Sequence, residues 1–285
     1  MSSIAVKDVE VTNSLIWFRN DLRINDHPGI NSALSISGKV IGFYCFNSSM
    51  FKMTNLGFPK IDKFRAKFLL ETIENLKEDL KKINVTLIIK IGDPVEELTK
   101  IISQQKIKNI FFQKEWTQEE VDEEDQLKSK CNDKNFKSFY SQFLYDPDDL
   151  DINNISNVFT NFRKHCEKKL KVKDLVESPK KLLDDNLLKD DYLIPSLSDL
   201  GLEDFEMDSR SAFKFKGGCN AAKERLDFYL WQSKKINFYK QTRNGLIGQD
   251  YSSKFSSWLS NGSISAREIF WEIKDYEKNI LKNQS

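Results

Sequence analysis

The stretch LIWFRNDLRINDHPGINSALSISGKVIGFYCF, residues 15–46, decides the fold class of this chain. It opens with the apolar run 15–18, passes through a polar turn into a helical pattern at 26–36, and closes with the apolar run 39–46. Two buried strands joined through a helix are typical of a parallel sheet, because a parallel crossover needs about a dozen residues or more. We therefore expect the chain to begin as an α/β fold.

The same alternation of strand and helix continues along the first half of the chain. Residues 60–84 place apolar side chains on one helical stripe, and Asp93 followed by Pro94 is a typical helix start. Thr117 with Glu120 forms a capping box ahead of another helix. The remaining expected strands are 85–91, 109–113 and 137–144, and the remaining expected helices are 95–105 and 119–131. This order predicts a doubly wound, mostly parallel five-stranded sheet with helices on both faces.

A polar, turn-rich stretch at residues 145–156 is the expected boundary between two domains, 1–150 and 151–285. Beyond it the strand patterns fade and helical patterns take over, with a break at 242–250. The second domain is therefore expected to be all-helical.

Composition narrows the class of protein. The 44 basic and 43 acidic side chains give a net charge of +1, so binding to nucleic acid would have to rest on a local patch. The four cysteines lie far apart without a C-x-x-C pair, which fits reduced cytosolic thiols. The polar N-terminus has no apolar signal core, and no run approaches the roughly 18 apolar residues of a membrane span. We expect a cytoplasmic protein without a membrane partner.

Several common sites are absent from the sequence. It holds no G-x-G-x-x-G or G-x-x-x-x-G-K-[ST], and the turn RNDLRIND has no glycine, which argues against a nicotinamide-dependent dehydrogenase. His27 and His165 are the only histidines, and neither has a partner at i,i+4, so we expect both to be structural or exposed and expect no metal site. The acidic run 119–125 is interpreted as an exposed helical face.

Two places carry candidate binding chemistry. In DYSSKFSSWLSNGSISAREIF, residues 250–270, Ser252, Ser253 and Lys254 precede a predicted helix start. Hydroxyls, an ammonium and free N–H groups can bind an anion, although serines there also serve simply as helix caps, and chemistry alone leaves both interpretations open. Glu115 follows a strand where a parallel sheet opens into its ligand crevice, and by position alone a binding role and a turn role are equally favoured.

Several stretches resemble one family. LIWFRNDLRINDHPGINSAL, residues 15–34, closely resembles the opening motif of photolyases and cryptochromes. Three further stretches resemble the DASH-type branch of the cryptochromes. They are NVFTNFRKHCE at 157–167, FKGGCNAAKERLDFYLW at 215–231 and FYKQTRNGLIGQDYSSKFSSWLSNGSISAREIFWEIKDYE at 238–277. The resemblance covers essentially the whole chain from Leu15, and the last motif is long enough to be highly specific.

The resemblance implies an N-terminal α/β domain with an antenna chromophore, for which 5,10-methenyltetrahydrofolate is the candidate, and a C-terminal all-helical domain that binds FAD. It implies blue-light-driven, FAD-dependent repair of cyclobutane pyrimidine dimers, in single-stranded DNA for this branch, or photoreception.

Site residues follow from the matching motifs. Glu115 falls at a carboxylate used by the folate antenna, and Arg243 falls where the family places an arginine near DNA phosphate. Tyr239 matches a flavin contact. The FAD phosphate segment is matched by Ser252, Ser253, Lys254, Phe255 and Ser256. No residue is assigned a catalytic role.

The chain also departs from the family pattern. Cys219 stands in GGC where the family has GGE, and Ser257 stands in SSW where it has SPW. The sequence stops at Ser285, before the tryptophan-arginine-aspartate-phenylalanine helix of the family's flavin domain. We therefore expect an incomplete FAD-binding domain, a partial FAD site with weak retention, and a need for a second polypeptide.

The missing helices also predict an uncovered apolar stripe, formed by Phe255, Trp258, Leu259, Ile264, Ile269 and Ile273. The alternatives to a repair protein are a non-catalytic α/β chromophore-binding or scaffold module, and an inactive truncated remnant.

Overall fold

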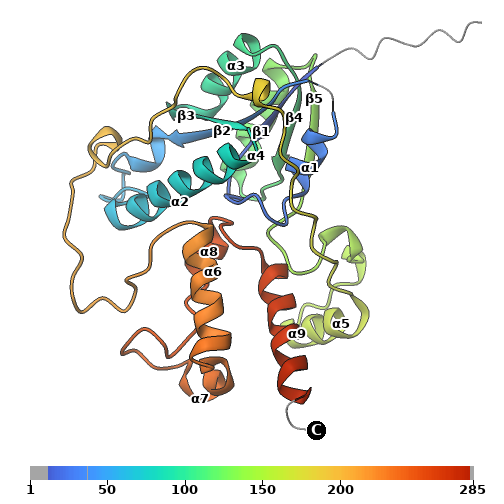
Figure 1. The fold of residues 1–285 in the computed structure, drawn as a ribbon, viewed down its shortest axis with the longest axis vertical. Helices are drawn as coiled ribbons and strands as arrows, with labels where there is room; N and C mark the ends of the chain where they lie inside the picture. Colours follow the sequence, from blue (N-terminus) through green and yellow to red (C-terminus); the bar gives the residue numbers. More distant parts are fainter. Residues whose placement is uncertain (1–11, 37, 283–285) are drawn as a thin grey trace, which may run out of the picture.

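The computed structural model describes residues 12–36 and 38–282, and the polar stretch discussed for its lack of a signal core lies mostly outside them. A parallel sheet forms the centre of an α/β lobe, and residues 217–282 form a helical lobe (Figure 1). The strand order is β3-β2-β1-β4-β5, with every neighbouring pair parallel. The strands are β1 (Asn13–Trp17), β2 (Val40–Asn47), β3 (Thr86–Gly92), β4 (Ile107–Gln113) and β5 (Asn135–Phe139). The predicted five-stranded parallel sheet is confirmed.

Helices cover both faces of the sheet, as the doubly wound prediction requires. One apolar core lies between the sheet and α1 and α2, where Ile73 and Leu76 of the predicted stripe are buried. The other lies beneath α3 and α4, around Leu98 and Leu127. These helices are α1 (Pro28–Leu34), α2 (Lys63–Lys82), α3 (Pro94–Gln104) and α4 (Gln118–Lys130).

Two local details differ from the prediction. Strand β5 ends at Phe139 rather than at residue 144, because its only paired neighbour, β4, ends at Gln113 and leaves no ladder to continue. Thr117 does lie at the N-cap of α4, but its side chain makes no capping hydrogen bond. Arg19 instead donates to the backbone oxygen of Glu120 at 2.9 Å, so a tertiary contact fixes the first turn of α4. By contrast, Asp93 caps α3 as predicted, accepting from the N–H of Glu96 at 2.9 Å.

The segment between the lobes returns to the sheet. After α5 (Phe159–Lys169), the chain climbs back over the α/β lobe before it descends to the helical lobe (Figure 1). We call residues 182–202 the strap. Asn186 anchors it, because its side chain accepts from the N–H of Val40 at 2.8 Å and donates to the carbonyl oxygens of Val40 and Asn84. Leu200 of the strap is buried in the same core as α1 and α2.

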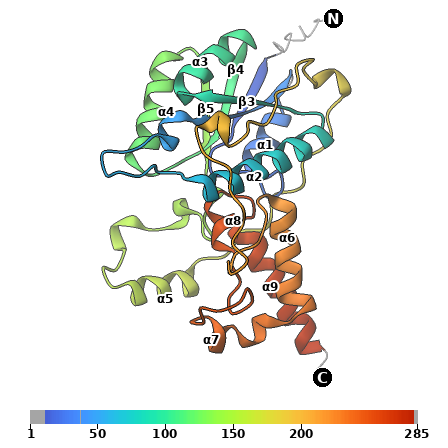
Figure 2. The same ribbon diagram turned by 90° about the vertical axis from the view of Figure 1, so that its left-hand side faces the viewer.

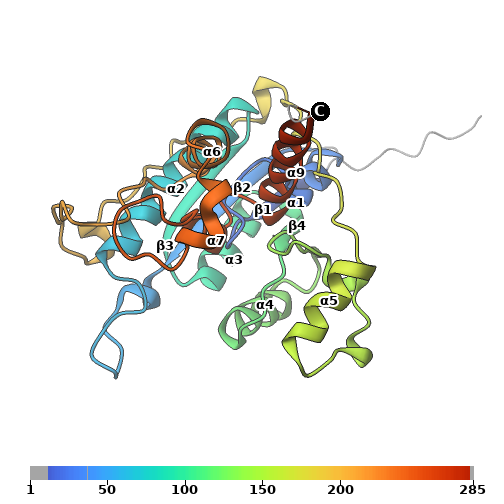
Figure 3. The same cartoon turned by 90° about the horizontal axis from the view of Figure 1, so that it is seen from below.

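The helical lobe hangs beneath the sheet, with α5 standing to one side (Figure 2). Helix α6 meets α2 at a close approach: the N–H of Gly217 donates to Glu71 and the N–H of Gly218 donates to Thr72. A view from below shows α6 near α2, and α4 and α5 on the other side (Figure 3). The helices of this lobe are α6 (Cys219–Asp227), α7 (Tyr239–Thr242), α8 (Ser256–Ser260) and α9 (Ala266–Lys282), with a π-helical turn at Phe228–Gln232.

A buried polar cluster in the turn after β1 joins the two lobes. Arg23 is 1% exposed and donates to the carbonyl oxygens of Asp26, Ser141 and Gly262. Asp26 pairs with Arg267 of α9, whose two nitrogens donate to its carboxylate at 2.7 and 3.0 Å. The turn after β1, which contains Arg23 and Asp26, therefore connects the α/β lobe to the helical lobe.

The helical lobe has an apolar core of its own, which corrects one expectation. Trp258, Ile264 and Phe255 are 0%, 1% and 7% exposed and pack with residues of α6, α9 and the segment before α6. Leu259, Ile269 and Ile273 are partly buried against the same core. The expected uncovered stripe is therefore wrong, because α6 and the aromatic segment 213–215 cover it within this chain.

Candidate flavin-phosphate site

The loop at residues 249–255, between α7 and α8, contains the predicted phosphate-contacting residues. Ser252, Ser253 and Lys254 are half-buried there, and Phe255 is buried beneath them. Neither serine caps α8, because the N-cap position is occupied by Phe255 and no side chain makes a capping hydrogen bond. The cap interpretation of these serines is therefore wrong.

Arg225 of α6 holds this loop in place. Its side chain is 3% exposed and pairs with the carboxylate of Asp250 at 2.7 Å. It also donates to three backbone carbonyl oxygens, of Gln249 at 3.2 Å, Ser252 at 3.0 Å and Ser253 at 3.1 Å. The guanidinium lies over the aromatic rings of Phe215, Phe228 and Tyr229. The buried side chain of Arg225 thus neutralises the carboxylate of Asp250 and holds the backbone of the loop through three carbonyl oxygens.

Lys254 has an unusual conformation for a lysine. Its φ is +64°, in the left-handed region, and its ammonium lies 3.6 Å from the ring centroid of Tyr251. Within the described part of the chain Lys254 has no carboxylate within ion-pair distance. Among the residues that the structure describes, no carboxylate neutralises its charge.

Tyr229 lies beneath the same loop with an unsatisfied polar group. The ring is fully buried, and its hydroxyl has no hydrogen-bond partner among the described residues. Burial raises the pKa of Tyr229, the charge of Arg225 opposes this shift, and Tyr239 and Asp250 add to it. A buried hydroxyl without a partner is uncommon in folded proteins and can mark a place for a ligand or a water.

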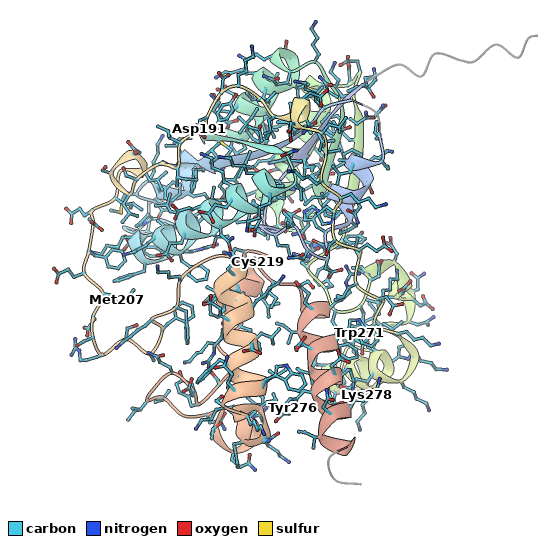
Figure 4. The ribbon with its side chains drawn as sticks, in the orientation of Figure 1. Asp191, Met207, Cys219, Trp271, Tyr276 and Lys278 are labelled. Atoms are coloured by element: carbon cyan, nitrogen blue, oxygen red, sulfur yellow. The ribbon has the colours of Figure 1, made fainter. Side chains whose placement is uncertain are left out.

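Tyr239 and Arg243 lie on the segment that leads into the loop. Tyr239 is 39% exposed and Arg243 is exposed, while Gly245 sits against the side chain of Tyr251. Helix α7, which carries Tyr239, lies at the lower end of the helical lobe, and α8, which begins with Ser256, lies at its upper end, so the phosphate segment lies on the chain that joins them (Figures 1 and 2). Figure 4 shows the neighbouring helices, with Tyr276 of α9 on the side facing α6 and Trp271 on the side of α5. Ser256, the last residue of the predicted segment, is exposed at the start of α8.

Glu115 lies elsewhere, at the carboxyl end of β4 in the α/β lobe. Its carboxylate accepts from Asn20 at 3.1 Å and from Gln113 at 3.0 Å. Burial raises the pKa of Glu115 above its usual range, although these two donors and Arg19 oppose the shift. Beside it, Trp116 is 52% exposed and stacks on Tyr140 at 5.5 Å with 11° between the ring planes.

A cleft of about 1200 Å³ opens at the carboxyl ends of β1 and β2, between the α/β lobe, the segment 205–215 and α8. Arg19 lies at its inner wall, stacked 4.5 Å over Trp17, and one of its guanidinium nitrogens has no hydrogen-bond partner in the described part of the chain. Arg19 also lies 3.7 Å from Glu123, and Glu124 is 9% exposed. The acidic run 119–125 is therefore not a simple exposed face, because Arg19 draws its inner side toward the cleft.

The histidines and cysteines lie in contrasting surroundings. His27 is buried, caps α1 and lies 2.9 Å from Asp21, whereas His165 is exposed. All four cysteines are free and buried, and burial raises the pKa of Cys219. Across residues 12–36 and 38–282 no group of three or more metal-ligating side chains is present, and no helix there is long and apolar enough to cross a membrane.

Sequence reasoning missed Arg225, Tyr229 and Arg19 as functional candidates. Arg225 precedes Tyr229 by four residues, so a helical spacing already places the two on one face. Their importance comes from the loop at 249–253, which is distant in sequence, and no local pattern could have revealed it.

Comparison with known proteins agrees with this geometry. The family model described as DNA photolyase matches residues 14–181. The cryptochrome DASH of Gloeobacter violaceus is 39% identical over 275 residues, which cover 95% of this chain and 55% of that protein.

Solved structures extend the similarity into the helical lobe. The crystal structure of a Synechocystis cryptochrome superimposes with a TM-score of 0.87 at 35% identity, over 94% of this chain and 56% of that one. An archaeal photolyase from Sulfolobus tokodaii, solved with two FAD molecules, has a TM-score of 0.64 at 20% identity, covers 94% of this chain and 56% of its own, and shows the shared fold alone.

The chain thus spans about half the length of the relatives it matches. Members of this family generally bind FAD and act on DNA. The match over residues 14–181, together with the DASH cryptochromes at 30–39% identity, shows that the chain belongs to the DNA photolyase family.

Proposed function

We propose that this chain supplies the α/β lobe and the phosphate-holding part of the flavin site in a DASH-type photolyase or cryptochrome. The observation that carries the proposal is the loop at 249–255, which Arg225 holds rigidly while Lys254 keeps a positive charge without a carboxylate partner. A fixed loop with an ammonium and hydroxyls suits a diphosphate, since anions favour charge-assisted donors.

In this proposal the residues of the loop bind and orient the cofactor. Lys254, Ser252, Ser253 and Ser256 hold the diphosphate of FAD, Phe255 supports the loop from below, and Tyr239 contacts the flavin. Arg243, exposed at the end of α7, binds a DNA phosphate. Bound FAD supplies blue-light absorption and electron transfer to a cyclobutane pyrimidine dimer in single-stranded DNA.

We further propose that the rest of the flavin site comes from outside this sequence, from a second polypeptide. The relatives carry nearly half of their length beyond the matched region. Phe238, Leu246 and Ile247, close to the predicted site residues, are 56%, 86% and 94% exposed. Such apolar side chains would be covered by additional helices.

The test is cofactor retention with and without a partner. We expect the purified chain alone to retain FAD weakly or not at all, because ring burial supplies much of a cofactor's affinity. Co-expression with a polypeptide equivalent to the unmatched half of the Gloeobacter protein should give a yellow complex. This complex should reverse dimers in irradiated single-stranded oligonucleotides under blue light. In this complex, Lys254→Met should weaken FAD retention. Lys240→Met is the control, because Lys240 is exposed and has no proposed role, and this variant should retain FAD as the wild type does.

Two results would contradict the proposal. Stoichiometric flavin on the chain alone would argue against the need for a second polypeptide. A complex without light-dependent repair and without flavin would instead favour the inactive remnant.

A second candidate function is a chromophore-binding module without catalysis. The cleft of about 1200 Å³ at the strand ends has the size and position of a ligand site in an α/β fold. Glu115 does not line this cleft itself but accepts from Asn20, which does, and with the exposed stacked pair Trp116 and Tyr140 beside it Glu115 is the proposed contact for 5,10-methenyltetrahydrofolate. Titration with this folate should produce a near-ultraviolet absorbance shift that Glu115→Gln reduces. Unchanged folate binding by the Glu115→Gln variant would show that the folate does not contact Glu115. No folate binding by the wild type would refute the proposed antenna.

A further inference from the structure

The contacts of Arg225 determine which way the peptide groups of the loop face. The carbonyl oxygens of Ser252 and Ser253 both accept from its guanidinium. In a planar trans peptide the C=O and the N–H of the next residue point in opposite directions. The N–H groups of Ser253 and Lys254 are therefore directed away from Arg225, on the opposite side of the loop.

These two N–H groups are free to bind something else. In the part of the chain that the structure describes, neither N–H donates to a backbone or side-chain acceptor. They are consecutive along the chain, and the second belongs to a residue with a left-handed φ of +64°. Successive N–H groups turned to one side of a loop form an anion-binding concavity.

We propose that Arg225 is a positioning residue for the diphosphate. By binding the carbonyl oxygens of Ser252 and Ser253, it turns the N–H groups of Ser253 and Lys254 toward the anion. Its guanidinium, which is 3% exposed and paired with Asp250, also lies behind the same peptides. This inference rests on the proposed function of the loop as a diphosphate site, and it adds the residue and the donor atoms that make the loop competent.

A purely packing role for Arg225 predicts something different. Its guanidinium lies on Phe215, Phe228 and Tyr229, so any truncation would lower the stability of the helical lobe. A role in packing alone, however, does not predict that the amides of Ser253 and Lys254 are the groups whose resonances shift when an anion binds. Nor would a pure charge effect distinguish arginine from lysine, whose ammonium cannot form the same fork of hydrogen bonds.

The experiment titrates the full chain with inorganic pyrophosphate and follows the backbone amide resonances by NMR. In the wild type we expect the largest shifts at the N–H of Ser253 and of Lys254. Arg225→Lys, which keeps the charge and loses the fork, should bind pyrophosphate at least about tenfold more weakly. The matched control is Arg210→Lys, because Arg210 pairs with Asp208 at the surface and its side chain is 88% exposed. It should bind within about twofold of the wild type.

Each outcome decides the matter. Equal affinity for Arg225→Lys and the wild type overturns the inference, as does a wild type whose shifts lie away from residues 253–254 or that binds no pyrophosphate. If the Lys variant fails to fold, the wild-type shift pattern still decides. Pyrophosphate binding at these amides without any FAD binding, alone or with the second polypeptide, would refute the proposed function and leave the role of Arg225 intact.

Discussion

Asp26 joins the two lobes through a buried ion pair with Arg267. Its side chain is 1% exposed, binds Arg267 through both oxygens and accepts from the N–H of Val176 at 3.0 Å. Its φ is +48°, a conformation that aspartate and asparagine tolerate better than most residues. A substitution by asparagine therefore tests the charge and leaves the backbone unstrained.

Asp26→Asn should destabilise the protein by about 3 kcal/mol, because it leaves the largely buried guanidinium of Arg267 without its counter-ion. Urea unfolding followed by circular dichroism would measure the loss. Asp208→Asn is the control, since its exposed pair with Arg210 should be worth less than about 1 kcal/mol. Similar losses for the two variants would mean that the buried pair does not join the lobes.

Glu115 should make stability depend on pH. Its folded-state pKa is raised by burial, so its contribution to stability is fully present below the unfolded pKa of about 4.3 and is lost as pH rises through the folded value. Glu115→Gln keeps an acceptor for Asn20 and Gln113 and removes this loss. The Gln variant should therefore gain stability relative to the wild type as pH rises from about 4 to 7. Unfolding free energies at the two pH values would measure this, and a constant difference would show that the carboxyl is adequately solvated.

At the scale of elements, the packing of α6 on α2 depends on a glycine pair. A Cβ on Gly217 would lie 2.0 Å from the carbonyl oxygen of Phe68, and one on Gly218 would lie 2.7 Å from the Cβ of Asn75. Gly218 also has a φ of +96°. Only glycine satisfies both the backbone conformation and the close approach.

Gly218→Ala should cost about 3 kcal/mol or more, since it adds overlap with α2 to backbone strain. Gly201→Ala separates the two effects, because Gly201 has a φ of +75° and open space around its Cβ position. Its cost should be only about 1 to 2 kcal/mol. Thermal unfolding of both variants would measure the difference, and equal shifts would mean that α6 can move away from α2 without loss.

Prediction from sequence succeeded for elements whose signal is local. The strands and the helices of the α/β lobe follow from apolar periodicity, and the start of α3 follows from Asp93 and Pro94. The strap could not be predicted, because Asn186 contacts Val40 across 146 positions of sequence. The site residues came from family resemblance, and their roles remain predictions. Arg225 was missed because its contacts lie on a loop 24 to 28 residues further along the chain, and no periodic pattern connects the two segments.

At the scale of the whole molecule, the strap completes the core of the α/β lobe. Leu200 is buried in that core, and Leu182, Tyr192, Ile194, Leu197 and Leu202 are packed against it. Removal of the strap would therefore expose apolar surface on the sheet and its helices.

A shortened chain ending at residue 150 should accordingly be less stable than one ending at residue 202. Burial of apolar surface stabilises by roughly 25 cal/mol per Å², so several half-buried side chains amount to about 3 kcal/mol or more. Urea midpoints of the two fragments would measure the difference. The control is Asn186→Ala in the longer fragment, which should lose part of the gain by releasing Val40 and Asn84. Equal midpoints would show that the strap merely lies on the surface.

The position of the strap in the chain also sets an order of events during synthesis. Strand β5 closes the sheet at Phe139, yet the core beneath α1 and α2 waits for Leu200, some 60 residues later. At roughly 5 to 20 residues per second, a ribosome needs several seconds to deliver them. During that interval the nascent sheet lacks the cover of the strap, and exposed apolar surface of this kind favours aggregation. The order of synthesis thus leaves the core of the α/β lobe incomplete until residue 200 has been added.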